Sequence, residues 1–338
     1  MKVMVLLTIA LFPYVNIYGQ ESFRLPDYPG KWLYLNENNS GEWYDESFYR
    51  MNTTELNAYH KTHEKFESFF RNQPLVSHIK GINLSAKSRA MYDHYDHARY
   101  PVKNNERVKA RLFIQFCPIL KRENKIEWFC DEVPYMDIVT NYPKACYESG
   151  TSITLLNNLD VCNKMLEMFY MPDSLLDLGD GVILFDWYYE NRVVIAVNKR
   201  PWWKPVTTRE YIERTLAYHK ESLKEGNTEE QIVLDAIEKE IALVPEWLLD
   251  QPVYLSNELD DRPLLGICSK NEPGARAFCK FNPGYFDNTL PKTTVQLITI
   301  TIPGHNDSKD YGEIDSQNLW KYIEGLKGAD LLKLLSTN

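Results

Sequence analysis

The sequence predicts an α+β fold: a mainly antiparallel sheet with a helical hairpin, N-terminal helices and a C-terminal helix. Predicted strands and helices are intermixed without a regular β-α-β rhythm, and several neighbouring strands are separated only by short turns. The chain is 44% hydrophobic and 25% charged, which is typical of a folded protein with a substantial core. We expect residues 20–338 to form a single large unit with a helical N-terminal part (about 20–105) and a helical hairpin (about 207–244). A doubly wound nucleotide-binding fold is disfavoured.

The first 19 residues have the pattern of a secretory signal peptide. Lys2 gives a basic start, residues 3–12 form an apolar run, and a small residue, Gly19, stands where a peptidase would cut. The run is too short to cross a membrane, which needs about 20 apolar residues, and no second long apolar run follows. We expect a soluble protein that is secreted or periplasmic, with no membrane span after cleavage.

Two helices are expected in the N-terminal part. Apolar residues recur at steps of three and four over residues 54–71, Asn52 or Thr53 caps the start, and Pro74 marks the end. A second, shorter helix is expected over residues 86–98, because apolar residues gather on one side and a proline follows.

The middle of the chain predicts β-hairpins. A turn over residues 121–124 separates strands over 107–119 and 125–130. A second turn joins a strand over 182–189 to an apolar strand over 192–197, which we expect inside a covered sheet. Further strands are expected over residues 253–255, 264–268, 277–281 and 294–302.

The second half of the chain predicts a helical hairpin. Thr207 and Glu210 fit a capping box that starts a helix, Gly226 ends it, and a second helix begins after Asn227. Two more helices are expected over residues 156–170 and 316–335.

The six cysteines favour disulfides, because an even number of cysteines in an exported chain is usually paired. No Cys-x-x-Cys motif is present, so a structural zinc site built from cysteines has no support. Cys268 and Cys279 flank a turn at residues 271–274, and antiparallel strands on either side would place them opposite each other, so we expect them to form a disulfide. The pairing of the other four stays open: Cys117, Cys130, Cys146 and Cys162.

The charge of the chain argues against a nucleic-acid partner. The formal net charge is −9 and the acidic residues are spread along the chain, whereas phosphate binding relies on a basic face. No Gly-rich phosphate loop is present, and no cofactor is expected apart from zinc at a histidine cluster. Asn-x-Ser/Thr sequons, which matter only in a host that glycosylates, begin at Asn38, Asn52, Asn83 and Asn306.

Five of the seven histidines fall between residues 60 and 97, and four of these form i, i+3 pairs on the two expected N-terminal helices. With a nearby carboxylate they give the candidate metal ligands His60, His63, Glu64, His94 and His97. Three such ligands and a water would bind zinc and activate a hydroxide. The alternative is that His63 and His94 pack in or beside the apolar stripes of their helices. In that case His60 with Glu64, and Asp93 with His97, are plain surface pairs.

An aromatic and basic loop joins the second β-hairpin to the helical hairpin. Trp202 and Trp203 follow Lys199 and Arg200 there. Exposed indoles beside cations can stack on a sugar ring or hold a partner, so these four are the candidate binding residues. The alternative is that one or both indoles cap the core while the cations are solvated.

We therefore expect a non-catalytic envelope protein that binds a ligand or a partner through an aromatic surface. The alternative function is a metal-assisted hydrolase that uses the histidine and carboxylate cluster in residues 60–97. The two differ in one respect, since the hydrolase requires those side chains to converge in a cleft.

Overall fold

The structure is α+β, as the sequence predicts. Helices and strands each take up 33% of the residues that the structure describes, and the strands are mostly antiparallel. The computed structural model describes residues 22–34, 49–91, 107–122, 124–130, 133–142, 165, 168–186, 191–197, 201–256, 264–282, 284–303 and 313–335. The predicted signal peptide, residues 1–19, lies outside these ranges. None of the helices within them is long and apolar enough to cross a membrane.

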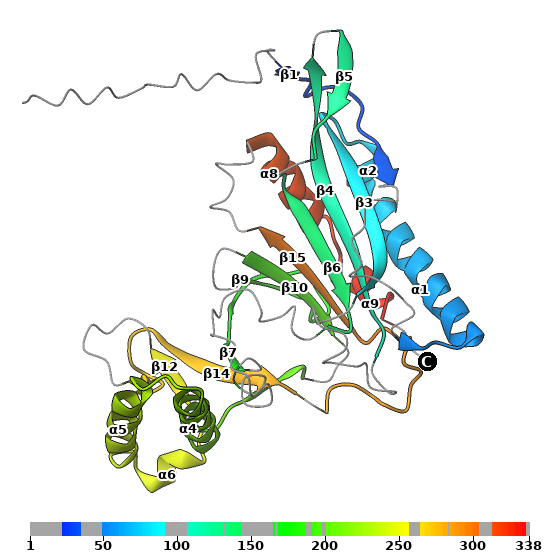
Figure 1. Ribbon diagram of the computed structural model, residues 1–338. Helices are drawn as coiled ribbons and strands as arrows, with labels where there is room; N and C mark the ends of the chain where they lie inside the picture. The colour runs from blue at the N-terminus through cyan, green and yellow to red at the C-terminus, as the bar shows by residue number, and fades with distance from the viewer. Residues whose placement is uncertain are drawn as a thin grey trace, which may run out of the picture.

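Ten strands form the larger sheet (Figure 1). Across the sheet the order is β2 (Trp32–Tyr34), β3 (Ile82–Met91), β4 (Lys109–Arg122), β6 (Tyr135–Thr140), β15 (Leu297–Pro303), β10 (Asn191–Val197), β9 (Ile183–Asp186) and β8 (Asp173–Asp177). Two short strands, β1 (Ser22–Arg24) and β5 (Lys125–Trp128), pair with the end of β4. β2 and β3 are parallel, and the other strand pairs of the described sheet are antiparallel.

The main core lies on the face of this sheet that the even-numbered residues of its strands share. Side chains alternate across a strand, so every second residue is buried there, as at Ile82, Leu84, Leu112, Ile114, Met136, Ile138, Ile298 and Ile300. The helices α1 (Thr53–Arg71), α8 (Glu313–Glu324) and α9 (Gly328–Leu332) add apolar residues to the same core, and the short α2 (Pro74–Ser77) follows α1. The Tyr322 hydroxyl of α8 donates to the Phe70 carbonyl of α1 at 2.5 Å, which joins two of these helices.

Asn52 caps α1, as predicted. Its side-chain oxygen accepts a hydrogen bond from the Glu55 amide at 3.0 Å, and the Glu55 carboxylate accepts one from the Asn52 amide at 2.9 Å. This reciprocal capping box satisfies two backbone donors that the first turn of a helix otherwise leaves unpaired.

A smaller sheet carries the predicted helical hairpin. β12 (Tyr254–Ser256) and β11 (Trp203–Pro205) pair with β14 (Ala275–Phe281), β13 (Ile267–Cys268) pairs with β12, and β7 (Met168–Tyr170) also pairs with β14. The helices α4 (Thr208–Lys224), α5 (Glu230–Ile241) and α6 (Glu246–Leu249) lie with this sheet at the lower left of Figure 1. The carboxylate of Glu210 on α4 accepts hydrogen bonds from Arg214 and from Lys280, and the second contact ties the hairpin to β14.

Parts of two predicted helices are strands. Residues 82–91 form β3, which overlaps the helix expected over 86–98. Apolar and polar residues alternate from Ile82 to Lys87, and this period of two lets the strand pair in register with β4 along its whole length. β7 likewise occupies the end of the helix expected over 156–170.

The predicted disulfide between Cys268 and Cys279 is wrong, because β12 lies between the two strands that carry them. Tyr254 of β12 pairs with Cys268 in β13 and with Ala277 in β14. Neighbouring strands lie about 4.8 Å apart, so the two cysteines are separated by about two such spacings, whereas the Cα atoms of a disulfide lie within about 7 Å. The bond that the structure contains joins Cys117 to Cys130, two of the four cysteines whose pairing the sequence left open.

Asn141 connects the ends of three strands of the larger sheet. It is 1% exposed and adopts a φ of 54°, in the left-handed region. Its amide nitrogen donates to the carbonyls of Val108 and Thr294, at 3.1 and 3.0 Å. Its amide oxygen accepts from the Gln296 amide at 2.8 Å and from the Leu297 amide at 3.4 Å. The side chain thus satisfies buried backbone groups where β4, β6 and β15 come together.

Candidate binding surface

β4 is longer than the strands beside it, and its end carries a three-stranded ribbon. β6 pairs with β4 as far as Gln115, and β3 pairs with it as far as Pro118. Beyond these points β4 pairs with β1 on one edge and with β5 on the other, at the top of Figure 1. We call residues 22–24, 119–122 and 125–128 the β1–β4–β5 ribbon.

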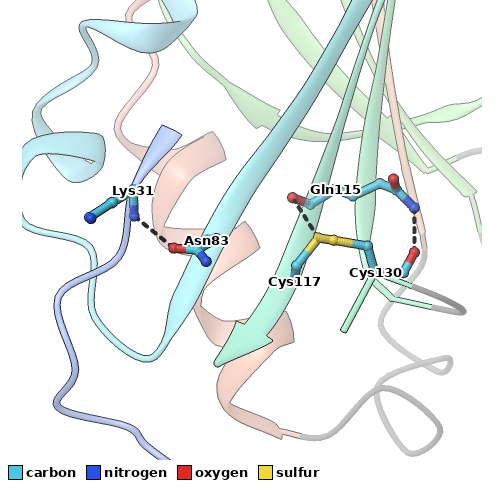
Figure 2. Close-up of a disulfide and its surroundings, with 5 residues drawn as sticks. All are labelled: Lys31, Asn83, Gln115, Cys117 and Cys130. Atoms are coloured by element: carbon cyan, nitrogen blue, oxygen red, sulfur yellow. Dashed lines mark hydrogen bonds between the residues drawn. A yellow bond between two sulfur atoms is a disulfide. The ribbon is translucent and has the colours of Figure 1, made fainter. Parts of the chain in front are cut away.

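The Cys117–Cys130 disulfide holds the base of this ribbon. It links β4 to the chain that leaves β5, with the two Cα atoms 4.7 Å apart. The side-chain amide of Gln115 donates to the Cys130 carbonyl at 3.0 Å, as Figure 2 shows. The Phe129 amide donates to the Pro118 carbonyl at 3.2 Å. The position of β5 against β4 is therefore fixed by one covalent bond and two hydrogen bonds beyond the strand itself.

One face of the ribbon exposes three large apolar side chains. Phe23 and Ile126 both pair with Lys121, from opposite edges of β4. Trp128 pairs with Ile119, two residues away along β4. Directly paired residues and residues two apart along a strand share a face, so Phe23, Ile126 and Trp128 lie on the same face, which we call the apolar face. These three side chains are 60%, 46% and 55% exposed, and exposed apolar groups gathered in this way mark interaction sites.

Charged residues occupy the end of the ribbon and the face opposite the apolar face, and of the described ones only Lys121 lies on the apolar face itself. Arg122 pairs with Lys125 where the hairpin turns, and Lys121 lies between two apolar side chains. The described ribbon residues carry four cations, Arg24, Lys121, Arg122 and Lys125, and one carboxylate, Glu127. Glu123, in the turn, lies outside the described residues. The described ribbon is thus basic, whereas the chain as a whole has a net charge of −9.

Of the candidate metal-binding histidines, the structure describes two: His63, which is half-buried, and His60, which is exposed. His63 and Tyr59 on α1 have ring centroids 5.3 Å apart, and His63 lines a small cavity of about 10 Å³ between α1 and the larger sheet. Burial, and secondarily the nearby His60, lower the pKa of His63 from 6.5 to about 4. A neutral imidazole packed in this way agrees with the packing alternative for His63.

The other candidate ligands do not complete a metal site within the described residues. His60 and Glu64 are exposed on α1, and His94 and His97 lie outside the described ranges. Across the part of the chain that the structure describes, no group of three histidine, cysteine, aspartate or glutamate side chains is placed to hold a metal ion. A metal site formed with His94 and His97 stays a prediction.

Of the two tryptophans, Trp202 lies in the core and Trp203 packs against that core while partly exposed. Trp202 is 5% exposed, stacks on Phe169 with centroids 5.8 Å apart, and meets Phe185 edge-on at 6.2 Å. Trp203 is half-buried on β11, where it pairs with Phe281. The structure thus places Trp202 in the core, as the alternative to a binding role expects, while Lys199 and Arg200 lie outside the described residues.

Sequence reasoning missed the apolar face altogether. The signal that points to it is an alternation of apolar and charged residues in Lys125–Trp128, a strand whose residues are all exposed in the structure. Comparison of the chain with protein-family models, with curated proteins and with solved structures found no match.

Proposed function

We propose that this chain is an exported, non-catalytic binding protein that docks a partner protein through the apolar face of the β1–β4–β5 ribbon. The observation that carries the proposal is the exposure of Phe23, Ile126 and Trp128 on one face of a strand ribbon that a disulfide braces. Aromatic and aliphatic anchors on a rigid element are the usual source of binding energy at protein interfaces, because little entropy is lost when they are buried.

The position of the charges favours a protein partner over a membrane. An interfacial membrane anchor puts its apolar residues at the part that enters the lipid first. Here the end of the hairpin carries Arg122 and Lys125, and the apolar side chains project sideways from the face of the ribbon. A partner with an apolar pocket can cover that face while the charged end stays in water.

The chemistry of the partner follows from the middle of the face. Lys121 lies between Phe23 and Ile126, so a partner that covers both side chains also desolvates this ammonium group. Burying a charge is costly unless it is paired. We therefore propose a partner whose apolar pocket is flanked by a carboxylate that meets Lys121.

The exported location rests on the sequence. The basic start, the short apolar run and the small residue at Gly19 form the pattern of a secretory signal. Disulfides persist in oxidising compartments, and the Cys117–Cys130 bond is consistent with such a location.

Site-specific photo-crosslinking tests the proposal. A photoreactive phenylalanine analogue at Ile126 should give one adduct of defined mass with a protein from the secreted fraction of the producing organism. The matched control places the same analogue at Ile232 on α5, which is 75% exposed and lies on the helical hairpin. Adduct formation at Ile126, its loss in Trp128→Ser and its absence at Ile232 are the expected results.

A second test measures how tightly variants of the apolar face bind the partner that the crosslinking identifies. Trp128→Ser should weaken binding about 30-fold, which corresponds to about 2 kcal/mol for an anchor side chain. Lys121→Glu should weaken binding as well, because it places a carboxylate against the partner's carboxylate. Equal adduct yields at Ile126 and Ile232, or sedimentation of the wild-type chain with phosphatidylserine vesicles that Trp128→Ser abolishes, would overturn the proposal.

A further inference from the structure

Two of the four glycosylation sequons lie in the described residues, and their asparagines differ in solvent exposure. Asn52 begins one of them, ahead of α1, and Asn83 begins the other, inside β3. Modification of an asparagine needs a side-chain nitrogen that can carry a bulky sugar chain in solvent. The two sites can therefore be ranked by what surrounds each amide.

Asn52 is exposed, and it caps α1 through the oxygen of its side-chain amide alone. The oxygen accepts the hydrogen bond from Glu55 that caps α1. The nitrogen makes no hydrogen bond within the described residues, and the other sequon positions, Thr53 and Thr54, are exposed on the first turn of the helix. A sugar on the nitrogen would leave the capping oxygen in place.

Asn83 is 6% exposed in an interior strand of the larger sheet. Its oxygen accepts a hydrogen bond from the Lys31 amide at 2.9 Å (Figure 2), just before β2 begins. Asn83 pairs with Cys117 of the neighbouring strand β4, at the base of the ribbon. A sugar chain at this position would have to displace the segment that leads into β2, so the folded protein has no room for one.

We propose that Asn52 carries an N-linked glycan when the chain passes through a glycosylating secretory pathway, and that Asn83 in the folded protein does not. In the reaction the Asn52 side-chain nitrogen attacks the anomeric carbon of the first sugar of a lipid-linked oligosaccharide pyrophosphate. The bond from that carbon to the pyrophosphate oxygen breaks, the lipid pyrophosphate leaves, and a proton from the amide nitrogen passes to a base of the transferase. The product keeps the Asn52 carbonyl oxygen that caps α1.

The glycan would lie far from the apolar face. The Tyr49 hydroxyl, just before Asn52, accepts a hydrogen bond from the amide of Lys109 at the start of β4. Lys121 lies twelve residues further along β4, which at about 3.3 Å per residue is about 40 Å away. In Figure 1 the start of α1 is at the lower right and the ribbon is at the top. A glycan on Asn52 thus leaves partner binding through the apolar face open, and the inference shares with the proposed function only the exported location.

The test uses the full chain secreted from a glycosylating eukaryotic cell line behind a host signal peptide, so that it does not depend on the chain's own signal or on any partner. The folded, secreted protein is treated with peptide N-glycosidase in ¹⁸O-water, which converts each glycosylated asparagine to an isotopically marked aspartate, and the peptides are mapped by mass. The mark is expected on Asn52 and absent from Asn83.

Two matched variants each destroy one sequon while keeping its asparagine in place. Thr54→Ala destroys the first sequon but keeps the Asn52 cap, and it should remove the mark and one glycan mass. Ser85→Ala destroys the second sequon, and it should leave the mass of attached glycan unchanged. It should also leave folding unchanged, because the buried Ser85 hydroxyl has no hydrogen-bond partner within the described residues. An unmarked Asn52 in folded wild-type protein, or a marked Asn83, would overturn the inference.

Discussion

Replacing His63 by phenylalanine should make the protein less sensitive to acid. His63 is placed by α1 against a small cavity whose described lining residues carry no charge: Tyr59, Thr62, Phe66, Val108, Ala110, Thr140, Thr293 and Val295. Loss of water around the imidazole, with a smaller effect from His60, lowers the pKa of His63 to about 4. A phenylalanine ring fills a similar space and does not take up a proton.

The sign of the effect follows from the two pKa values. Between pH 6.5 and about pH 4 the unfolded chain holds a proton on His63 that the folded chain does not hold. The free energy of unfolding therefore falls as the pH falls through this window, by about 1.4 kcal/mol for each pH unit. Relative to pH 8, about 2 kcal/mol is lost at pH 5, and the loss approaches about 3 kcal/mol below pH 4.

Urea unfolding at pH 8 and pH 5 measures this contribution directly. The wild-type protein should lose about 2 kcal/mol more than His63→Phe between the two pH values. His60→Gln, at an exposed position one turn away, is the matched control and should behave nearly as the wild type does. If His63→Phe loses as much stability as the wild type, or if the His63 imidazole titrates near pH 6.5 by NMR, the burial argument is refuted.

Three further predictions concern the fold. Asn141→Ala should lower the free energy of unfolding in urea by about 3 kcal/mol, because it leaves buried backbone groups unsatisfied; a loss below about 1 kcal/mol would contradict this role. Trp202→Ala should cost about 3–5 kcal/mol in the same assay because Trp202 lies in the core, whereas Trp203→Ala should cost clearly less, and equal losses would refute the division between them. Replacing Cys117 and Cys130 together by alanine should cost about 3 kcal/mol, since their bond closes a loop with a sequence separation of 13; a variant as stable as the oxidised wild type would show that the bond contributes nothing.

The elements that the sequence predicts best are those whose signals are local. The Thr207 hydroxyl accepts a hydrogen bond from the Glu210 amide at 3.2 Å, and Gly226 adopts a φ of 100° just after α4 ends. Capping residues and glycines of this kind act within a few residues of where they stand, so the helical hairpin follows from its own sequence. The capping box at Asn52 identifies the start of α1 for the same reason.

The elements that cannot be predicted from the sequence depend on strands that are distant in the chain. β3 gains its hydrogen bonds from β4, and the paired histidines that follow β3 favour a helical interpretation of the whole region. The position of β12 between β13 and β14 depends on pairing across the smaller sheet, so no turn signal near Cys268 or Cys279 reports it. For the candidate sites, an apolar stripe indicates that His63 can be buried but does not show whether a charged partner accompanies it.

The Cys117–Cys130 bond also determines which side chains form the apolar face. A turn confined to residues 121–124 would place Cys117 opposite Trp128. In the structure Arg122 pairs with Lys125 instead, and the same register, extended along β4, places Cys117 opposite Cys130. A slip of one residue would turn Ile126 and Trp128 to the other face of the ribbon. The disulfide forms only in the register that keeps both side chains beside Lys121, so the bond and the apolar face depend on the same strand pairing. The double alanine variant at Cys117 and Cys130 should therefore weaken partner binding as well as stability, even at temperatures where the rest of the sheet remains folded.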